Sequence, residues 1–408
     1  MAATIDKATS DKLMITTAWK TWLLSAVHAM LLLFVCYYLW NRPDTLSGES
    51  GFIRIFNAAT KAFSGQDMIS DSILLVNVAY DRQLIDYKYD NGEPAGNIDI
   101  TDRYKLLELF RYLENTSYAY ILCDVFFDST LKTEWDDSLF TLMSQLPRLV
   151  VPKHEEEKPL PALLEKKAAY ADYKTNILEG DLLKYEYLQH GEESVPLFMW
   201  KERTGGTFEK KVPGYKMEGK RATNSVIIDF QVKMPEEYNK EVQKQTYVEK
   251  EKNYWNLGAD LLETLQYVEP SEIFKNKMIL IGDLTEHDTH STTAGTMPGV
   301  LINYNAYLAL IKGSPQTPFF LGMTLFVVFY IMSFLVFSQK QVVDLLPLKN
   351  DTVKLLVSWL GFSAILILLN TIAYYFWGRF IEIFFWATYF SAAKLIIDLC
   401  KLFKRNKK

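Results

Sequence analysis

The chain has 408 residues, of which 49% are hydrophobic and 23% are charged, and its mean hydropathy is close to zero (−0.03). The formal net charge of −5 argues against a nucleic-acid partner, since such a protein needs a basic face. With only 19 Gly and 14 Pro the chain is neither collagen-like nor low-complexity, and 3 Cys cannot build a disulfide framework. The intermediate hydropathy indicates a mixture of membrane segments and a polar domain.

The first apolar run extends from Trp22 to Trp40 and carries no formal charge. A helix of this length, rising 1.5 Å per residue, crosses a hydrocarbon core of roughly 30 Å. Aromatic residues stand at both ends of the run, where amphipathic rings favour the membrane interface. The alternative is a cleaved signal peptide, but its apolar region is about 7–15 residues long and ends in small residues. We therefore predict an uncleaved membrane helix over residues 19–40, after a cytoplasmic tail over residues 1–18.

Residues 41–316 form a polar stretch of about 275 residues, which is long enough to bury one large core. Three short apolar runs within it are continuous rather than alternating: Ser72–Ala79, Ala119–Phe127 and Lys277–Gly282. Continuous apolar strands are typical of parallel sheets that are covered by helices on both faces. We expect these runs to be the central strands.

Helical spacing of apolar residues predicts a helix over Thr101–Asn115, with Asp99 or Thr101 as its cap. The other elements predicted outside the middle of the domain are a helix over Asp136–Leu146, a strand over Arg148–Pro152 and a helix over Val300–Lys312. Strands alternating with helices favour an α/β fold.

The middle of this stretch, about residues 153–255, is dense in charges of both signs and in Tyr. A turn is predicted at Thr204–Gly206, and the strand candidates are Leu182–Tyr187, Val195–Trp200 and Ser225–Phe230. The predicted fold class is therefore an α/β extracytoplasmic domain with a mainly parallel central sheet and an antiparallel or irregular insertion.

Three further apolar runs close the chain and predict membrane helices over residues 317–337, 355–377 and 380–400. Lys and Arg are frequent in the N-terminal tail, in the loop over residues 338–354 and in the tail over residues 401–408. Because Lys and Arg near membrane helices favour the cytoplasmic side, four spans leave both termini in the cytoplasm and residues 41–316 outside it. The expected location is a bacterial inner membrane with a periplasmic domain.

Acidic residues follow three of the predicted strands: Asp81 after the first, Asp124 with Asp128 after the second, and Asp283 with Asp288 after the third. In open parallel sheets, ligands bind outside the carboxyl ends of the strands, so these residues are candidates for a ligand site. The alternative is that the acids cap helices and hold loop amides, as Asp commonly does.

One loop carries Asp283, Glu286, His287, Asp288 and His290, all of them residue types that bind zinc. It lacks a helical His-Glu-x-x-His spacing and an evident distant ligand, so a plain polar loop is favoured, and His287, Asp288 and His290 are the candidates if a metal binds. The sequence has no nucleophile elbow and no phosphate-binding Gly-rich loop, so we expect neither an enzyme nor a cofactor.

With these elements assembled, the chain resembles the type-2 CHASE domain family, extracytoplasmic sensory domains named for their association with cyclases and histidine kinases. The resemblance covers about residues 45–315, and the stretches that carry it are Ile73–Asp81, Ala119–Asp128, Glu179–Lys184, Val226–Phe230 and, most closely, Asn276–Asn305. It adds Asn305 to the candidate ligand residues and supports Asp288. The chain departs from the family pattern at Asn77, Ala79 and Asn303. The resemblance therefore leaves open whether the chain shares a ligand site with the family.

The resemblance implies a sensor that detects a ligand or an envelope state. Family members often continue into an output domain, whereas only Lys401–Lys408 follows the last predicted span here. The expected partners are therefore the lipid bilayer and a separate protein that carries the output, such as a kinase, a cyclase or an envelope complex. A homo-oligomer is left open. The alternative function is a structural or accessory subunit that docks through its periplasmic domain.

Overall fold

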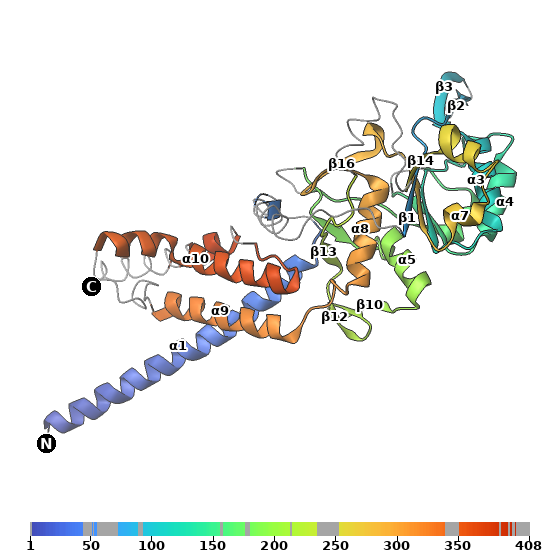
Figure 1. Cartoon of the computed structure of the whole chain (residues 1–408). Coiled ribbons are helices and arrows are strands. Elements are labelled where there is room, and N and C mark those ends of the chain that lie inside the picture. Colours follow the sequence, from blue (N-terminus) through green and yellow to red (C-terminus); the bar gives the residue numbers. More distant parts are fainter. Residues whose placement is uncertain are drawn as a thin grey trace.

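The computed structural model describes residues 2–43, 51, 53–54, 72–88, 93–155, 158–175, 180–212, 214–234, 253–338, 351–382, 385–390, 392–393 and 396. An α/β domain lies at one end of the molecule, and the long helices α1 (Ala2–Trp40), α9 (Phe319–Ser338) and α10 (Asp351–Trp377) extend from it (Figure 1).

A six-stranded sheet forms the centre of the α/β domain, and each of its ladders is parallel. In spatial order its strands are β14 (Tyr254–Asn256), β1 (Ile73–Asn77), β15 (Met278–Gly282), β4 (Tyr120–Asp124), β5 (Leu149–Lys153) and β6 (Ala168–Tyr170). The three continuous apolar runs are the adjacent central strands β1, β15 and β4. The prediction of a mainly parallel sheet is confirmed.

Both faces of the sheet are buried, because successive side chains of a strand point to opposite faces. Leu74 and Val76 join one core cluster with α3 (Arg103–Glu114), α4 (Asp136–Gln145), α7 (Pro270–Phe274) and the π-helix η2 (Leu257–Leu262). Ile73 and Leu75 join a second cluster with α5 (Val195–Thr204) and α8 (Gly299–Ile311). Continuous apolar strands are the sequence signature of this two-sided burial.

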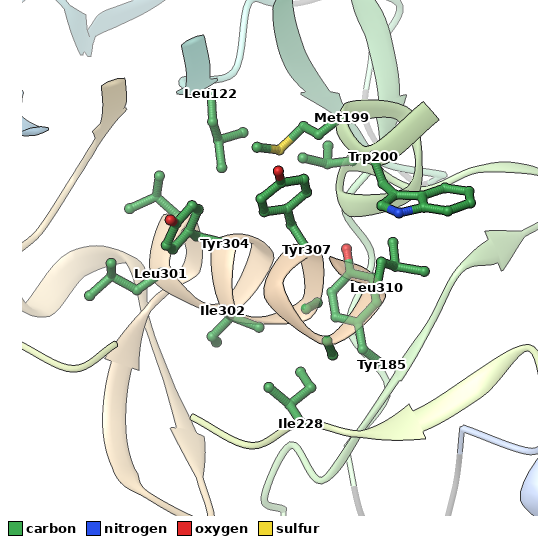
Figure 2. Packing of buried hydrophobic residues seen from close by; sticks show 14 of the residues in the cluster. Leu122, Tyr185, Met199, Trp200, Ile228, Leu301, Ile302, Tyr304, Tyr307 and Leu310 are labelled. Atoms are coloured by element: carbon green, nitrogen blue, oxygen red, sulfur yellow. The ribbon is translucent and has the colours of Figure 1, made fainter. Parts of the chain in front are cut away.

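Helix α8 lies inside the second cluster, and nearly all of its residues are buried. Tyr304 and Tyr307 lie on the side of the helix that faces Leu122 and Met199, while Ile228 lies on the other side (Figure 2). Helix α8 therefore packs between the sheet and the charged middle segment. It is also the last element of the domain before membrane-type helix α9 (Phe319–Ser338).

The middle segment has the predicted antiparallel character. Its ladders are β7 (Lys184–Glu186) with β13 (Ser225–Ile227), β8 (Leu188–Gln189) with β9 (Glu192–Glu193), and β10 (Phe208–Lys211), β11 (Gly214–Met217) and β12 (Lys220–Ala222) in one sheet. A short 3-10 helix, η1 (Ala162–Lys167), precedes β6.

The strand predicted over Val195–Trp200 is wrong, because these residues begin helix α5. Pro196 occupies its first turn, where a missing N–H costs nothing, and Gly205 ends it in the left-handed conformation (φ 68°). A six-residue apolar run does not by itself distinguish a buried strand from a buried helix.

Outside the middle segment, two hairpins were not predicted. One, β2 (Arg82–Lys88) with β3 (Pro94–Thr101), projects from the domain beside α3 (Figure 1). The other, β16 (Thr289–Thr292) with β17 (Gly295–Pro298), leads into α8, after a 3-10 turn η3 (Glu286–Asp288). The predicted caps of this helix, Asp99 and Thr101, belong to β3 instead. The N-cap of α3 is Asp102, whose carboxylate accepts a hydrogen bond from the Lys105 N–H.

Among the described residues, two helical segments are long and apolar enough to cross a membrane, Trp19–Trp40 within α1 (Ala2–Trp40) and Phe319–Ser338. The expectation of four such segments is therefore only partly supported. A helix, α10 (Asp351–Trp377), occupies the third predicted span, but its side chains are described only from Ser363 onward. Of the fourth predicted span, residues 380–400, the structure describes 380–382, 385–390, 392–393 and 396, and the others lie outside the described residues.

Candidate functional site

The carboxyl edge of the sheet begins with Asn77, Gly282 and Asp124, which stand in register at the ends of β1, β15 and β4. Asn77 is fully buried, and its Oδ1 accepts hydrogen bonds from the backbone N–H groups of Ala79 and Leu284, each at 3.1 Å. Its Nδ2 donates to Asn256 Oδ1 at 3.1 Å. Asn77 therefore holds the strand ends together, and both polar atoms of its side chain are used within the fold.

Asp81 is engaged by two partners on the α3 side of the sheet. Lys105 Nζ donates to its Oδ1 at 2.7 Å, and the Gly258 N–H donates to its Oδ2 at 3.0 Å. Gly258 belongs to the first turn of η2, whose free N–H groups attract an anion. Asp81 thus connects β1 to α3 and η2. Within the described residues it makes no contact with the other candidate acids.

Asp128 and Asp283 each fold back on the loop that follows them. Asp128 Oδ1 accepts from both the N–H and the hydroxyl of Thr130, each at 2.7 Å. Asp283 Oδ1 accepts from the N–H and the hydroxyl of Thr285 at 2.9 and 2.6 Å. These are the loop-stabilising contacts that short acidic side chains commonly make. The second Asp283 oxygen lies 3.5 Å from an Arg82 guanidinium nitrogen.

Asp124 and Asp288 are the two candidates that the fold brings together. A Cβ placed on Gly299, the first residue of α8, would lie 3.2 Å from Asp124 Oδ2, 3.0 Å from Asp288 Oδ2 and 3.2 Å from the Tyr173 hydroxyl. Asp124 Oδ2 is enclosed and has no hydrogen-bond partner among the described residues, whereas Asp288 is partly exposed. A side chain at residue 299 would enter the space between these oxygens, so that they would have to move apart.

The position of Asp124 changes its acidity. Burial, and to a smaller extent the nearby charge of Asp288, raise its pKa to about 8, and the Asn303 amide offsets part of this rise. Burial likewise raises the pKa of the Tyr173 hydroxyl, with Asp124 as the next contributor. The Asp124 carboxyl group therefore keeps its proton near neutral pH.

A chain of hydrogen bonds connects this pair to the insertion, and the sequence did not predict it. The Tyr185 hydroxyl donates to Asn303 Oδ1 at 2.7 Å, Asn303 Nδ2 donates to the Tyr173 hydroxyl at 2.9 Å, and that hydroxyl donates to the Gly299 carbonyl at 3.0 Å. The one available signal was Asn303 itself, one of two asparagines on a mostly apolar predicted helix and a departure from the family pattern.

Asn305 has a different role from the one expected of a ligand residue. Its side chain is fully buried and exchanges hydrogen bonds with the backbone of Val232, at 2.9 Å to Oδ1 and 2.8 Å from Nδ2. Nδ2 also donates to the Leu301 carbonyl at 2.8 Å. Asn305 therefore fixes the segment around Val232 onto α8, and its hydrogen-bonding groups are used within the fold.

The candidate metal ligands do not converge. Among the described residues, no three His, Cys, Asp or Glu side chains come together as a metal would require. His287 is exposed, and His290 Nε2 lies 3.4 Å from Asp288 Oδ1 while its ring packs against Tyr173 at 4.6 Å. The side chain of Glu286 lies outside the described residues. We derive no metal chemistry from this loop.

A second constellation joins the α/β domain to the membrane-type helices at the residues that follow β12. From α1, the Tyr37 hydroxyl donates to the Ala222 carbonyl at 2.7 Å, and Asn41 Oδ1 accepts from the Asn224 N–H at 2.8 Å. Between these contacts, Thr223 Oγ1 accepts from Arg379 Nη1 at 2.7 Å. We call residues 222–224 the junction segment.

Arg379 follows α10 and is almost completely buried. Its Nη2 donates to the carbonyl groups of Pro315 and Ser314 at 2.7 and 2.8 Å, just before α9. Trp40, at the end of α1, donates to the adjacent Phe380 carbonyl at 2.7 Å. The guanidinium thus connects the end of α10, the junction segment and the linker from α8 to α9.

Comparison with known proteins gives one family. The model of the CHASE2 domain matches residues 31–337, which is most of the chain. No curated protein and no solved structure matches. The matched range contains the whole α/β domain, the last part of α1 and nearly all of α9, and so includes both the acidic pair and the junction segment. The chain belongs to the CHASE2 family of extracellular sensory domains.

Proposed function

We propose that the protein is a membrane sensor whose extracytoplasmic domain responds to a ligand or an envelope state and transmits the change through its membrane helices to a separate protein. The two apolar helices that flank the domain support membrane insertion. The proposal includes four spans, a bacterial inner-membrane location, cytoplasmic termini and an output partner such as a kinase or a cyclase.

The junction segment is the observation that carries this proposal. A signal can shift a conformational equilibrium only when the two states differ in their contacts with it, and transmission needs a physical connection to the output helices. Residues 222–224 supply that connection, because α1 and Arg379 both bind them. The same segment continues directly into β13, which pairs with β7 beside Tyr185 and so approaches the Asn303 network.

The experiment isolates the partner by affinity purification of the full-length chain in mild detergent and then measures the partner's phosphoryl-transfer or cyclase activity in reconstituted vesicles. The variant Arg379→Gln removes the charged connection to the junction segment, and Lys312→Gln, an exposed lysine paired with Asp229, is the control. A sensor predicts changed output for Arg379→Gln and unchanged output for the control. Output that is insensitive to Arg379→Gln and to removal of residues 41–316 would rule out this function.

A structural role as an accessory subunit of an envelope complex is the second candidate, and the β2–β3 hairpin favours it. The hairpin projects from the domain, and Leu84 at its surface is 68% exposed (Figure 1). The outer edges of a two-stranded hairpin present backbone groups that can pair with a strand of another chain. A stoichiometric complex that persists without any signal and dissociates on Leu84→Lys would support this role over signalling.

A further inference from the structure

The small sheet formed by β10, β11 and β12 carries an excess of positive charge. Residues 208–222 contain five basic and two acidic residues, a local charge of +3, whereas the whole chain has a formal net charge of −5. The basic residues, all exposed, are Lys210, Lys211, Lys216, Lys220 and Arg221, and the acidic residues are Glu209 and Glu218. An acidic chain thus concentrates basic side chains on one small sheet.

The two faces of this sheet differ in character. Side chains alternate between the faces along each strand, and Phe208 and Met217, which pair across β10 and β11, are buried in the core. The opposite face carries Lys211, Lys216 and Arg221, and Lys216 stands directly opposite Arg221 in the β11–β12 ladder. We call this the basic face of the sheet.

The acids of the sheet do not balance these charges by direct pairing. Like charges placed directly opposite each other on adjacent strands repel, as Lys216 and Arg221 do. Glu209 Oε2 lies 3.0 Å from Lys211 Nζ, and Glu218 Oε1 accepts a backbone N–H at 2.7 Å. Within the described part of the chain, neither Lys216 nor Arg221 forms an ion pair. The charge pattern is therefore complementary to an anionic surface.

The basic face is turned toward the end of α1. Tyr37, in the last turn of α1, lies against Gly214, where an added Cβ would collide with its hydroxyl, and Gly214 shares the face of its ladder partner Lys211. The Arg221 guanidinium lies 5.4 Å from the centre of the Tyr37 ring. The Arg221 carbonyl accepts the Thr317 N–H at 2.8 Å, and α9 begins two residues later. Strand β12 thus lies where the α/β domain meets α1 and α9 (Figure 1).

This place corresponds to the level of lipid headgroups. Tyr37 and Tyr38 are near the end of the apolar segment Trp19–Trp40, and Tyr favours the membrane interface. Arg221, which lies over Tyr37, is at the same depth. The Cα atoms of directly opposite residues in an antiparallel ladder are about 4.5–5.5 Å apart, so Lys216 lies close to this level. Electrostatic attraction to a charged surface extends about 8–10 Å at physiological salt, and both side chains are within that range.

We propose that the basic face of the β10–β12 sheet binds anionic lipid headgroups of the membrane that α1 and α9 enter. Lys and Arg donate charge-assisted hydrogen bonds to phosphate oxygens, and anionic lipids attract basic residues that lie beside a membrane helix. The inference rests on the membrane insertion in the proposed function and adds a lipid partner to it. Bound lipid holds β12 against the bilayer at the start of the junction segment, so lipid composition acts where the membrane helices meet the domain.

The test uses the full-length chain in nanodiscs of phosphatidylcholine alone and of equal parts phosphatidylcholine and phosphatidylglycerol. Thermal unfolding and amine-reactive labelling of each lysine, read by mass spectrometry, are measured in both. The variant combines Lys216→Gln with Arg221→Gln. The control combines Lys132→Gln with Lys275→Gln, which removes the same charge at exposed lysines near α4 and α7, at the far end of the domain (Figure 1). A second control, Lys216→Arg with Arg221→Lys, keeps the charge.

Phosphatidylglycerol should raise the unfolding temperature of the wild type and of both controls, and not that of the Gln variant. In the wild type it should slow labelling of Lys216 at least about threefold, since one basic side chain near an anionic surface gains about a fivefold preference for it. Labelling of Lys275 should stay the same. Both effects should disappear at about 1 M salt, where the screening length falls to about 3 Å.

The proposal is overturned if Lys216 of the wild type is labelled equally fast in both kinds of nanodisc, a result that does not depend on the folding of any variant. It is also overturned if the Gln variant keeps the stabilisation by phosphatidylglycerol. Protection of Lys216 only in the complex with the output protein would assign the basic face to a protein and exclude the lipid. Failure of the sensor function would instead be seen as unchanged partner output in Arg379→Gln, with the effects of phosphatidylglycerol intact.

Discussion

Asp124 and Asp288 direct one carboxylate oxygen each, at 3.2 and 3.0 Å, toward the position that a Cβ on Gly299 would occupy. One acid ends a central strand and the other precedes the β16–β17 hairpin, so the fold brings them together at the first residue of α8. Burial, and to a smaller extent the nearby charge of Asp288, disfavours the ionised form of Asp124, which is why Asp124 retains a proton.

This pair predicts a pH-dependent stability. The pKa of Asp124 is about 8 in the folded protein, above its ordinary value of 3.8, so its stabilising contribution is fully present below about pH 4 and is lost as the pH rises toward 8. The slope between these limits is at most about 1.4 kcal/mol per pH unit. Chemical unfolding of the wild type and of Asp124→Asn at several pH values between 5 and 8 measures it.

Asp124→Asn should remove most of this slope, because an amide does not titrate. Asp229→Asn, at an exposed residue whose side chain is 66% accessible and which pairs with Lys312, is the matched control and should leave the slope unchanged. A slope that persists in Asp124→Asn would show that a different group is responsible.

The start of α8 gives a steric prediction. Gly299→Ala places a methyl group within 3.2 Å of the Asp124 and Asp288 oxygens, and such overpacking costs about 1–3 kcal/mol. Gly322→Ala in α9 is the control, since a Cβ there meets nothing within 4 Å and alanine favours a helix. The double variant Gly299→Ala, Asp288→Ala should recover part of the loss in thermal unfolding. A stability equal to wild type in Gly299→Ala would contradict the close approach.

Sequence reasoning predicted well those elements whose pattern of apolar residues fits a single type of secondary structure. The apolar runs at Ile73–Asn77 and Met278–Gly282 are strands because both of their faces are buried. By contrast, Val195–Trp200 has an apolar pattern that suits a strand or a helix, and the decisive signals were Pro196 and Gly205 at its ends. The β2–β3 hairpin contains polar residues on both faces, so its hydrophobic pattern did not reveal it.

The candidate site was predictable only in part. Strand ends locate the edge where acids gather, and this located Asp124 correctly beside Asp288. Strand ends do not reveal which acidic side chains bond to their own loop. Asp128 is one of these, since it accepts a hydrogen bond from the Thr130 N–H. Tyr173, from the insertion, is far from Gly299 in sequence. Their hydrogen bond forms because the insertion packs on α8, which no local sequence pattern indicates.

The junction predicts a local effect on dynamics. Arg379→Met leaves the carbonyl groups of Pro315 and Ser314 without their charged donor, and losing such bonds in a buried place costs about 1.5–3 kcal/mol. Arg379→Lys should restore little of this, because a single ammonium cannot reproduce the planar fork. Hydrogen exchange should accelerate at the amides of Thr223 and Asn224, which bond to Pro315 and Asn41. Unchanged exchange at both amides in Arg379→Met would contradict the role of Arg379 in the junction.

The last prediction concerns His28, which hydrogen-bonds to Ser333 and to Tyr389 and so connects three apolar segments. Ser333 Oγ in α9 donates its hydrogen to the Phe329 carbonyl at 2.6 Å, so it can only accept from His28 Nδ1 in α1, at 2.8 Å. His28 Nε2 is then free to accept the Tyr389 hydroxyl at 2.6 Å, which makes the imidazole neutral with its proton on Nδ1. The hydrogen bonds among these side chains connect the segments without a charge.

A double-mutant cycle of His28→Phe and Tyr389→Phe should therefore give a coupling free energy of about 0.6–1.7 kcal/mol, the range of hydrogen bonds between membrane helices. Unfolding in mixed micelles measures each variant. The pair Thr324→Val with Tyr389→Phe serves as control, since within the described part of the chain Thr324 bonds only to the Phe320 carbonyl of its own helix, and it should show no coupling. Additive effects of His28→Phe and Tyr389→Phe would show that the imidazole does not connect α1 to the last segment. In that case packing of the apolar faces, together with the Trp40–Phe380 hydrogen bond, would have to hold α1 against the last segment.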